Sequence, residues 1–167
     1  MTADPKIVPD AKVMDTVFYN EIFQMAEYGA KVLHPRAVEI AMRSNIPLVI
    51  RSILSDYKGT LITNYDRSRS YREDPERIVT SVAYIDNRTQ VKILPAQSEF
   101  EDHETLFASI AKAGISIDMI NIYPNQIYFI IDETQSDVLE DVLKNLNCSY
   151  SLLHHCTKVT IIGNRMR

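Results

Sequence analysis

A short segment at residues 29–41 holds the side chains best suited to phosphate chemistry. Lys31 carries a mobile point charge that can contact phosphate oxygens, and His34, three residues later, is a catalytic candidate by position. Each has a structural alternative. A lysine at a helix end is favourable to the helix dipole, and a histidine directly before Pro35 is typical of a helix start. From residue types alone, the segment predicts a helix, a tight bend and a second helix.

The sequence lacks the residues needed for a metal site, a glycine-rich phosphate loop or a nucleophile triad. Cys148 and Cys156 have no partners at metal-ligand spacing, and two of the four histidines, His154 and His155, are adjacent while the others lie far away in sequence. With four glycines, the sequence has no glycine-rich phosphate loop. We therefore expect no metal site, no nucleophile triad, and two reduced thiols in a cytoplasmic protein.

The composition is that of a globular protein with an acidic balance. Hydrophobic residues make up 46% and charged residues 24% of the 167 residues, and the net charge is -4. This balance argues against a nucleic-acid-binding surface, which is normally basic. No apolar run approaches the roughly 20 residues that cross a bilayer, and the N-terminus lacks the features of a signal peptide. The length suits one domain, or one domain plus part of another.

The first 77 residues predict a mixed α/β segment followed by a linker. The expected elements are a lead-in at 1–13, helices over 19–28 and 35–45, a buried strand at 48–50 and a strand at 60–63. Asp15 or Asn20 is expected to cap the first helix, with Gly29 at its end and Pro35 in the first turn of the second. Residues 64–77 carry charges that cancel, which predicts a solvated linker at a domain boundary.

The rest of the chain predicts a ferredoxin-like α+β domain. The expected elements are strands at 78–85 and 89–94 with a turn between them, a helix over 102–113, a hairpin of strands at 115–123 and 126–131, a helix over 136–146, and strands at 150–153 and 158–162. Asp102 and Ser136 are the expected caps, and Gly114 ends the first helix. The order β-α-β-β-α-β places two helices on one face of an antiparallel sheet.

Six segments occur in an order that matches one enzyme family. They are Thr2-Ala3-Asp4-Pro5-Lys6-Ile7-Val8, Gly29-Ala30-Lys31-Val32-Leu33-His34-Pro35, Lys58-Gly59-Thr60-Leu61-Ile62, Val79-Thr80-Ser81-Val82-Ala83, Gly114-Ile115-Ser116-Ile117-Asp118-Met119-Ile120 and Lys158-Val159-Thr160-Ile161-Ile162-Gly163. The sequence resembles the C-terminal part of the aspartokinases, and within that family it looks most like the diaminopimelate-sensitive type of Gram-positive bacteria.

The resemblance implies four parts: the tail of a kinase domain at 1–63, the linker at 64–77, an ACT regulatory domain at 78–157, and the first strand of a truncated second ACT domain at 158–167. Aspartokinases phosphorylate L-aspartate with ATP and magnesium to 4-phospho-L-aspartate, at the start of lysine, threonine, methionine and diaminopimelate biosynthesis. The family's phosphate-holding Lys-Phe-Gly-Gly-Thr-Ser segment does not occur in this sequence. We therefore expect the chain alone to be inactive and to need no cofactor.

Three residues are implied to bind nucleotide in the full-length enzyme. Lys31 matches the family lysine that helps to hold the nucleotide, and Val32 beside it packs near the base. Lys6 stands where the family usually has an arginine. Lysine keeps the positive charge and loses the bidentate fork, so we expect a weaker contact.

Five further residues are implied to bind an amino-acid effector, for which diaminopimelate, lysine and threonine are the candidates. Gln97, Ser98 and Glu99 lie in the loop after the first ACT strand, and Asp118 and Asn121 lie in the second. The loop lacks the Pro-Gly pair of the common family pattern, Asp-Lys-Pro-Gly. Strict alternation also places Asp118 and Asn121 on opposite faces of one strand, unless a bulge intervenes.

The resemblance further implies a homodimer formed through ACT domains. The alternative function is a stand-alone ACT-type regulatory subunit that binds an amino acid and has no kinase activity of its own. In such a protein the kinase-like residues 1–63 would have no purpose.

Overall fold

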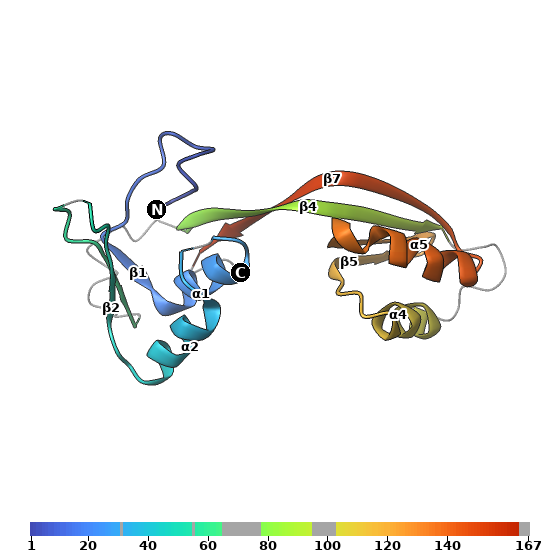
Figure 1. The fold of residues 1–167 in the computed structure, drawn as a ribbon, viewed down its shortest axis with the longest axis horizontal. Coiled ribbons are helices and arrows are strands. Elements are labelled where there is room, and N and C mark those ends of the chain that lie inside the picture. The colour runs from blue at the N-terminus through green and yellow to red at the C-terminus, as the bar shows by residue number, and fades with distance from the viewer. Residues whose placement is uncertain (31, 55, 65–77, 95–102, 164–167) are drawn as a thin grey trace. The chain divides into compact units, whose positions relative to one another are not determined.

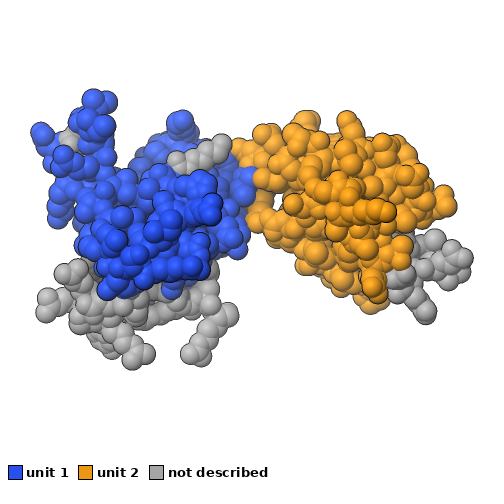
Figure 2. All heavy atoms as spheres, turned by 60° about the horizontal axis from the view of Figure 1, so that its bottom comes forward, with its two compact units in different colours: residues 1–85, 159–167 blue, residues 86–158 orange. Residues whose placement is uncertain are grey.

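The computed structural model describes residues 1–30, 32–54, 56–64, 78–94 and 103–163 (Figure 1). The chain divides into two compact units (Figure 2): unit 1 is residues 1–85 with 159–167, and unit 2 is residues 86–158. The predicted linker lies, apart from Asn64, outside the described residues. Residues 78–85, expected to open the ferredoxin-like domain, group with unit 1 instead.

Unit 1 begins with a strand that runs directly into a helix. β1 (Thr16–Phe18) is followed without a break by α1 (Tyr19–Glu27). The cap predicted at Asp15 or Asn20 is wrong, because Phe18 is the last extended residue and Asn20 already lies inside the helix. The Glu21 carboxylate caps α1 instead, by accepting a hydrogen bond of 3.0 Å from the Phe18 N–H. α2 (Pro35–Arg43) starts at Pro35, as predicted.

A three-stranded sheet in the order β1-β3-β2 completes unit 1. β3 (Thr60–Thr63) pairs parallel to β1 and antiparallel to β2 (Leu48–Ile50). The expectation that residues 48–50 are a buried strand is wrong, because β2 is an edge strand with Val49 59% exposed. The core of unit 1 consists of Met14, Val17, Tyr19, Ile22, Met25, Val38, Ala41, Ile62, Ala83 and Ile162.

Unit 2 confirms the ferredoxin-like prediction. A four-stranded sheet has the order β5-β6-β4-β7, with antiparallel pairing of β6 to both β4 and β5. The elements are β4 (Ser81–Leu94), α4 (His103–Lys112), β5 (Asp118–Tyr123), β6 (Gln126–Asp132), α5 (Ser136–Asn145) and β7 (Ser149–Ile162). Both helices lie on the same side of the sheet (Figure 1). Their buried residues, such as Ile110 and Leu143, pack against β4 and β6 side chains such as Phe129.

The strands predicted at 78–85 and 89–94 form one long strand, and so do those predicted at 150–153 and 158–162. β4 runs through the turn predicted at 86–87, and β7 joins the strands predicted at 150–153 and 158–162. Each of these strands contains one residue with a positive φ, which is Asn87 at 56° in β4 and His155 at 57° in β7. The strand continues on both sides of that residue. Thr157 donates a hydrogen bond of 2.6 Å to Asp86, so the residues where the chain enters and leaves unit 2 contact each other.

The start of α5 also differs from its prediction. A short 3-10 helix, η1 (Glu133–Gln135), precedes α5, so Ser136 is the first helical residue and not the cap. The cap falls one step earlier in the chain, where the Asp132 side chain accepts a hydrogen bond from the Thr134 N–H at the start of η1. Ser136 is buried and uses its hydroxyl elsewhere.

Candidate functional site

Gly29 sits at the bend between α1 and α2 because no other residue fits there. Its φ is +110°, a conformation that L side chains rarely adopt. A Cβ at this position would lie 2.2 Å from the Tyr84 carbonyl oxygen and 2.8 Å from the Ile85 side chain. The glycine of the kinase-like segment therefore serves close packing against β4. Lys31, two residues later, lies outside the described residues.

His34 has a structural role. Its Nδ1 accepts a hydrogen bond of 3.2 Å from the Arg36 N–H, which makes His34 the N-cap of α2. Pro35 follows at the first helical position, where its missing N–H costs nothing. Val32, predicted to pack near a nucleotide base, is 60% exposed in the connection between the two helices.

Lys6 lies on a turn of unit 1 that Asp4 organises. The Asp4 carboxylate accepts a hydrogen bond of 2.9 Å from the Lys6 N–H, and the Lys6 side chain is exposed. The other oxygen of Asp4 accepts a hydrogen bond of 3.3 Å from the Tyr84 hydroxyl. Within the described part of unit 1, Tyr84 therefore contacts both segments predicted to bind nucleotide, through its hydroxyl and its carbonyl oxygen. Sequence reasoning missed Tyr84, because nothing in residue type marks a tyrosine as a bridge between distant segments.

Asp118 and Asn121 lie on the same face of the unit 2 sheet. Asp118 pairs with Ile130 and Asn121 pairs with Tyr128, so three steps along β5 match two steps along β6. The extra residue is a bulge, and Met119 within it has a φ of 51°. The bulge is the exception that the sequence analysis left open, and it replaces the opposite faces that strict alternation would give.

The shared face is the one turned away from α4 and α5. The alternate β6 residues Ile127, Phe129 and Ile131 are buried in the core with the helices, whereas Tyr128 and Ile130 point the other way. Asp118 and Asn121 thus lie on the side of the sheet opposite α4 and α5, and both residues are exposed. Gln97, Ser98 and Glu99 lie outside the described residues.

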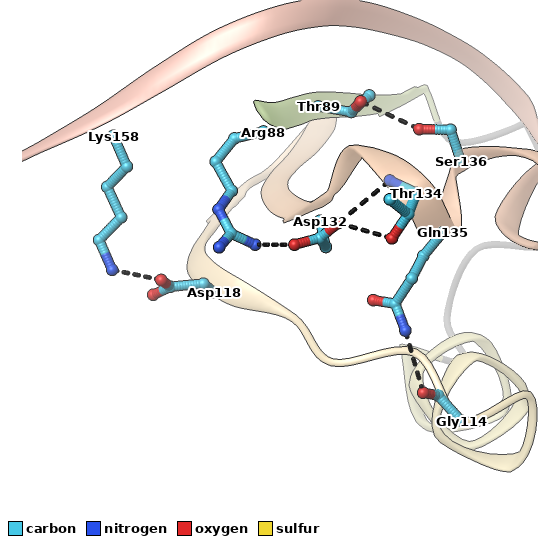
Figure 3. Close-up of polar contacts among 9 residues, drawn as sticks. All are labelled: Arg88, Thr89, Gly114, Asp118, Asp132, Thr134, Gln135, Ser136 and Lys158. Carbon is cyan, nitrogen blue, oxygen red and sulfur yellow. Dashed lines mark hydrogen bonds and ion pairs between the residues drawn. The ribbon is translucent and has the colours of Figure 1, made fainter. Parts of the chain in front are cut away.

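Two ion pairs lie at the end of the sheet where Asp118 begins β5 (Figure 3). The Lys158 ammonium of β7 contacts the Asp118 carboxylate. Arg88 of β4 pairs with Asp132 at 3.0 Å, and Asp132 is two residues from the Ile130 that faces Asp118. The Asp132 carboxylate also accepts hydrogen bonds from Thr134, 2.6 Å from its hydroxyl and 3.1 Å from its N–H. These hydrogen bonds, together with the nearby Arg88 charge, lower the pKa of Asp132.

A second polar cluster lies on the helix side of the sheet. The fully buried Thr89 hydroxyl lies 3.0 Å from the Ser136 hydroxyl and 3.1 Å from His154 Nδ1. The cluster joins β4, α5 and β7, which explains why Ser136 is buried. Thr89 and Ser136 are both buried, so the cluster serves packing between these elements.

Cys148 and Cys156 are free thiols, and burial raises the pKa of Cys148. Over the described residues, every helix is too short or too polar to cross a membrane.

Comparisons with known proteins match both units. The model of the amino acid kinase family matches residues 1–52. Aspartokinase 1 of Bacillus subtilis is 36% identical over 163 residues, which are 98% of this chain and 40% of that protein. The structure of E. coli aspartokinase III in complex with aspartate and ADP (R-state) superposes with a TM-score of 0.76 at 26% identity, covering 98% of this chain and 37% of that one.

The same E. coli enzyme in complex with lysine and aspartate (T-state) superposes with a TM-score of 0.73 at 28% identity. The coverage is again 98% of this chain and 37% of that one. This chain therefore spans about two fifths of the length of these relatives.

Proposed function

Because this chain is a homologue of the C-terminal part of aspartokinases over 98% of its length, we propose that it is the regulatory region and kinase-domain tail of such an enzyme. The whole protein would transfer a phosphoryl group from ATP, with magnesium, to L-aspartate in the cytoplasm. The observation that carries this proposal is the succession, in one chain, of a match to the amino acid kinase family at residues 1–52 and a ferredoxin-like unit at residues 86–158.

Residues 1–63 would then close one side of the nucleotide site, with Lys31, Lys6 and Val32 as its contacts. The exposure of Lys6 and Val32 supports this role, since both side chains are accessible to a ligand or to further protein. Residues 158–167 would open a second ACT module.

Unit 2 would sense an end product of the pathway, with diaminopimelate, lysine and threonine as candidates. The ligand's ammonium would bind Asp118, Asn121 would supply both a donor and an acceptor, and Gln97, Ser98 and Glu99 would complete the site. The bulge in β5 supports this, because it gives Asp118 and Asn121 a common face on the side of the sheet opposite α4 and α5.

Unit 2 would also form the homodimer. β5 is an edge strand, and its Met119, Ile120 and Ile122 side chains are each about half exposed. An edge strand with apolar side chains favours pairing with a second copy of the same strand. The alternative of a stand-alone amino-acid-binding subunit is less favoured, because such a subunit has no use for residues that match a kinase family.

The test is to express the whole coding sequence and to measure aspartate-dependent formation of ADP from ATP. We expect turnover, and inhibition by at least one of diaminopimelate, lysine and threonine. Turnover without inhibition would leave the kinase assignment intact and overturn the sensing role. Failure of purified, folded protein to turn over would favour the stand-alone subunit, provided that calorimetry still detects binding of one of the three amino acids.

A further inference from the structure

The N-terminal loop that carries Lys6 is closed at its base. The Thr2 N–H donates a hydrogen bond of 2.9 Å to the Lys12 carbonyl oxygen, and the Lys12 N–H donates one of 3.0 Å to the Thr2 hydroxyl. A surface loop whose ends lie close together is a compact unit of its own. Residues 2–12 therefore form one closed loop, and Lys6 is an exposed residue within it.

Asp4 shapes the turn inside this loop. Its carboxylate accepts the Lys6 N–H at 2.9 Å, and its carbonyl oxygen accepts the N–H groups of Ile7 at 3.1 Å and Val8 at 2.9 Å. An aspartate side chain that accepts a backbone N–H two residues later is a common way to fix a turn. The backbone position of Lys6 is thus set in part by the orientation of the Asp4 carboxylate.

Val82 and Tyr84 of β4 hold the loop against unit 1. The Val82 N–H donates a hydrogen bond of 2.9 Å to the Thr2 carbonyl oxygen, at the base of the loop. The Tyr84 hydroxyl donates one of 3.3 Å to the second carboxylate oxygen of Asp4. Because the other oxygen of Asp4 accepts the Lys6 N–H, a single carboxylate connects the Tyr84 hydroxyl to the Lys6 backbone.

The Lys6 side chain is available to an anionic ligand. It is exposed, and its ammonium takes part in none of the ion pairs between described residues. Ordering a long, flexible lysine side chain on binding costs affinity. A backbone that is already held in place lowers the total cost of ordering, so the hold on the Asp4 turn favours binding without any contact between Tyr84 and the ligand.

We propose that Tyr84 is a positioning residue for nucleotide binding, whose hydroxyl orients the Asp4 carboxylate and thereby holds Lys6 where it contacts ATP. Tyr84 acts through Lys6 and touches none of the reacting atoms. This inference rests on the nucleotide role proposed for Lys6, and it names a residue of β4 on which that role depends.

The test is a double-mutant cycle on the whole protein, read as the KM for ATP and the kcat at saturating aspartate. Tyr84→Phe removes the hydroxyl and keeps the ring. We expect it to raise the KM for ATP by about 2- to 10-fold, the range of one hydrogen bond, and to change kcat by less than about 2-fold. Lys6→Met should also raise the KM. Adding Tyr84→Phe to Lys6→Met should then have no further effect, because a positioning residue needs the group that it positions.

Tyr57→Phe is the matched control. The Tyr57 hydroxyl donates a hydrogen bond of 2.6 Å to the Asp15 carboxylate, so this variant removes a tyrosine–aspartate bond of the same unit that lies outside residues 2–12. We expect its KM for ATP to equal that of the wild type. A rise as large as that of Tyr84→Phe would indicate a general loosening of unit 1 and would overturn the proposal.

The outcomes separate this inference from the proposed function. If Lys6→Met raises the KM and Tyr84→Phe does not, the positioning role is overturned and the nucleotide role of Lys6 stands. The same conclusion follows if the two effects multiply in the double variant. If Lys6→Met leaves the KM unchanged, the nucleotide role of Lys6 fails and the positioning role fails with it. Absence of turnover in the folded whole protein overturns the kinase assignment and this inference together.

Discussion

Gly29 is fixed by two separate constraints, and a second glycine allows them to be separated. Gly29→Ala must place a side chain at φ +110° and bring its Cβ within 2.2 Å of the Tyr84 carbonyl oxygen. Gly114 has a φ of +76° with no heavy atom within 4 Å of a built Cβ, so Gly114→Ala suffers the conformational cost alone. We expect losses in the free energy of unfolding of about 3 kcal/mol or more for Gly29→Ala and about 1 kcal/mol for Gly114→Ala.

Urea denaturation of both variants measures these losses. Equal losses for the two variants would show that close packing against β4 contributes nothing at Gly29.

Asp132 links the stability of unit 2 to acid pH. Hydrogen bonds from Thr134 and the charge of Arg88 hold its pKa below the ordinary value, so the folded state favours the ionised carboxylate. This contribution is complete above the pKa of the unfolded chain and is lost as the pH falls through the lower pKa of the folded state. We therefore expect Asp132→Asn to flatten the fall in unfolding free energy between about pH 5 and about pH 2, as measured by urea titration at each pH.

Thr134→Val is the companion variant, since it removes the hydroxyl donor and leaves the N–H and Arg88. Its pH dependence should lie between those of the wild type and Asp132→Asn. A wild-type slope in Asp132→Asn would assign the acid sensitivity to other carboxylates.

At the residue scale the sequence singled out Asp118 and Asn121 as candidates but did not predict that they share a face. Alternation predicts opposite faces, and only the register with β6 reveals the extra residue in β5. Met119 adopts a positive φ without being a glycine, so no residue type marks the bulge. Lys158 was missed as a partner for a similar reason, because 40 residues separate it from Asp118 in sequence.

At the scale of elements, α2 offers a direct test of the role of His34. The histidine ring accepts the Arg36 N–H as an N-cap, so His34→Ala leaves that donor without its side-chain acceptor. We expect a loss in unfolding free energy of about 0.5–2 kcal/mol. His34→Asn, a favourable N-cap residue, should recover most of it.

Thermal unfolding of the two variants decides the question. If asparagine fails to rescue what alanine loses, the histidine contributes something other than a cap.

Helices were predictable here to within a few residues, and strands were not. Each helix carries an apolar stripe, and punctuating residues such as Pro35 and Gly114 mark where helices start and stop. The predicted strand ends at 86–87 and near residue 155 are wrong, because β4 and β7 continue through these positions. Asn87 and His155 take up the left-handed conformation locally, while pairing on both sides continues the strand. The local sequence does not show which strand pairs with which, so it cannot predict that the strand continues.

At the scale of the whole molecule, the two units have separate hydrophobic cores. Leu139 of α5 is fully buried in unit 2, and Ile62 of β3 is fully buried in unit 1. We expect Leu139→Ala and Ile62→Ala each to lower the stability of its own unit by about 2–5 kcal/mol. Amide hydrogen exchange should show Leu139→Ala accelerating exchange in residues 103–158, with the rates for residues 14–63 unchanged.

Ile62→Ala supplies the matched control, with the opposite pattern expected. Faster exchange throughout the chain in both variants would mean that the two units unfold as one cooperative body.

The division into units was not predictable from the sequence. The charged residues 64–77 suggested a domain boundary. The boundaries between the compact units lie instead inside β4, after residue 85, and inside β7, after residue 158. Ala83 and Val91 illustrate the reason: both are small apolar residues of β4, yet they pack in different cores, and residue type does not say which.

The route of the chain through unit 2 makes that unit exchangeable as a cassette. The chain enters on β4 and leaves on β7, which are neighbours in the sheet, and Asp86 and Thr157 are already joined by a hydrogen bond. Closing so short a gap costs little loop entropy. Replacing residues 86–158 by a two-residue hairpin turn is expected to leave a folded unit 1, which circular dichroism and a cooperative melt would verify. By the same geometry, a different domain could be grafted at these two points while residues 1–85 are left as they are.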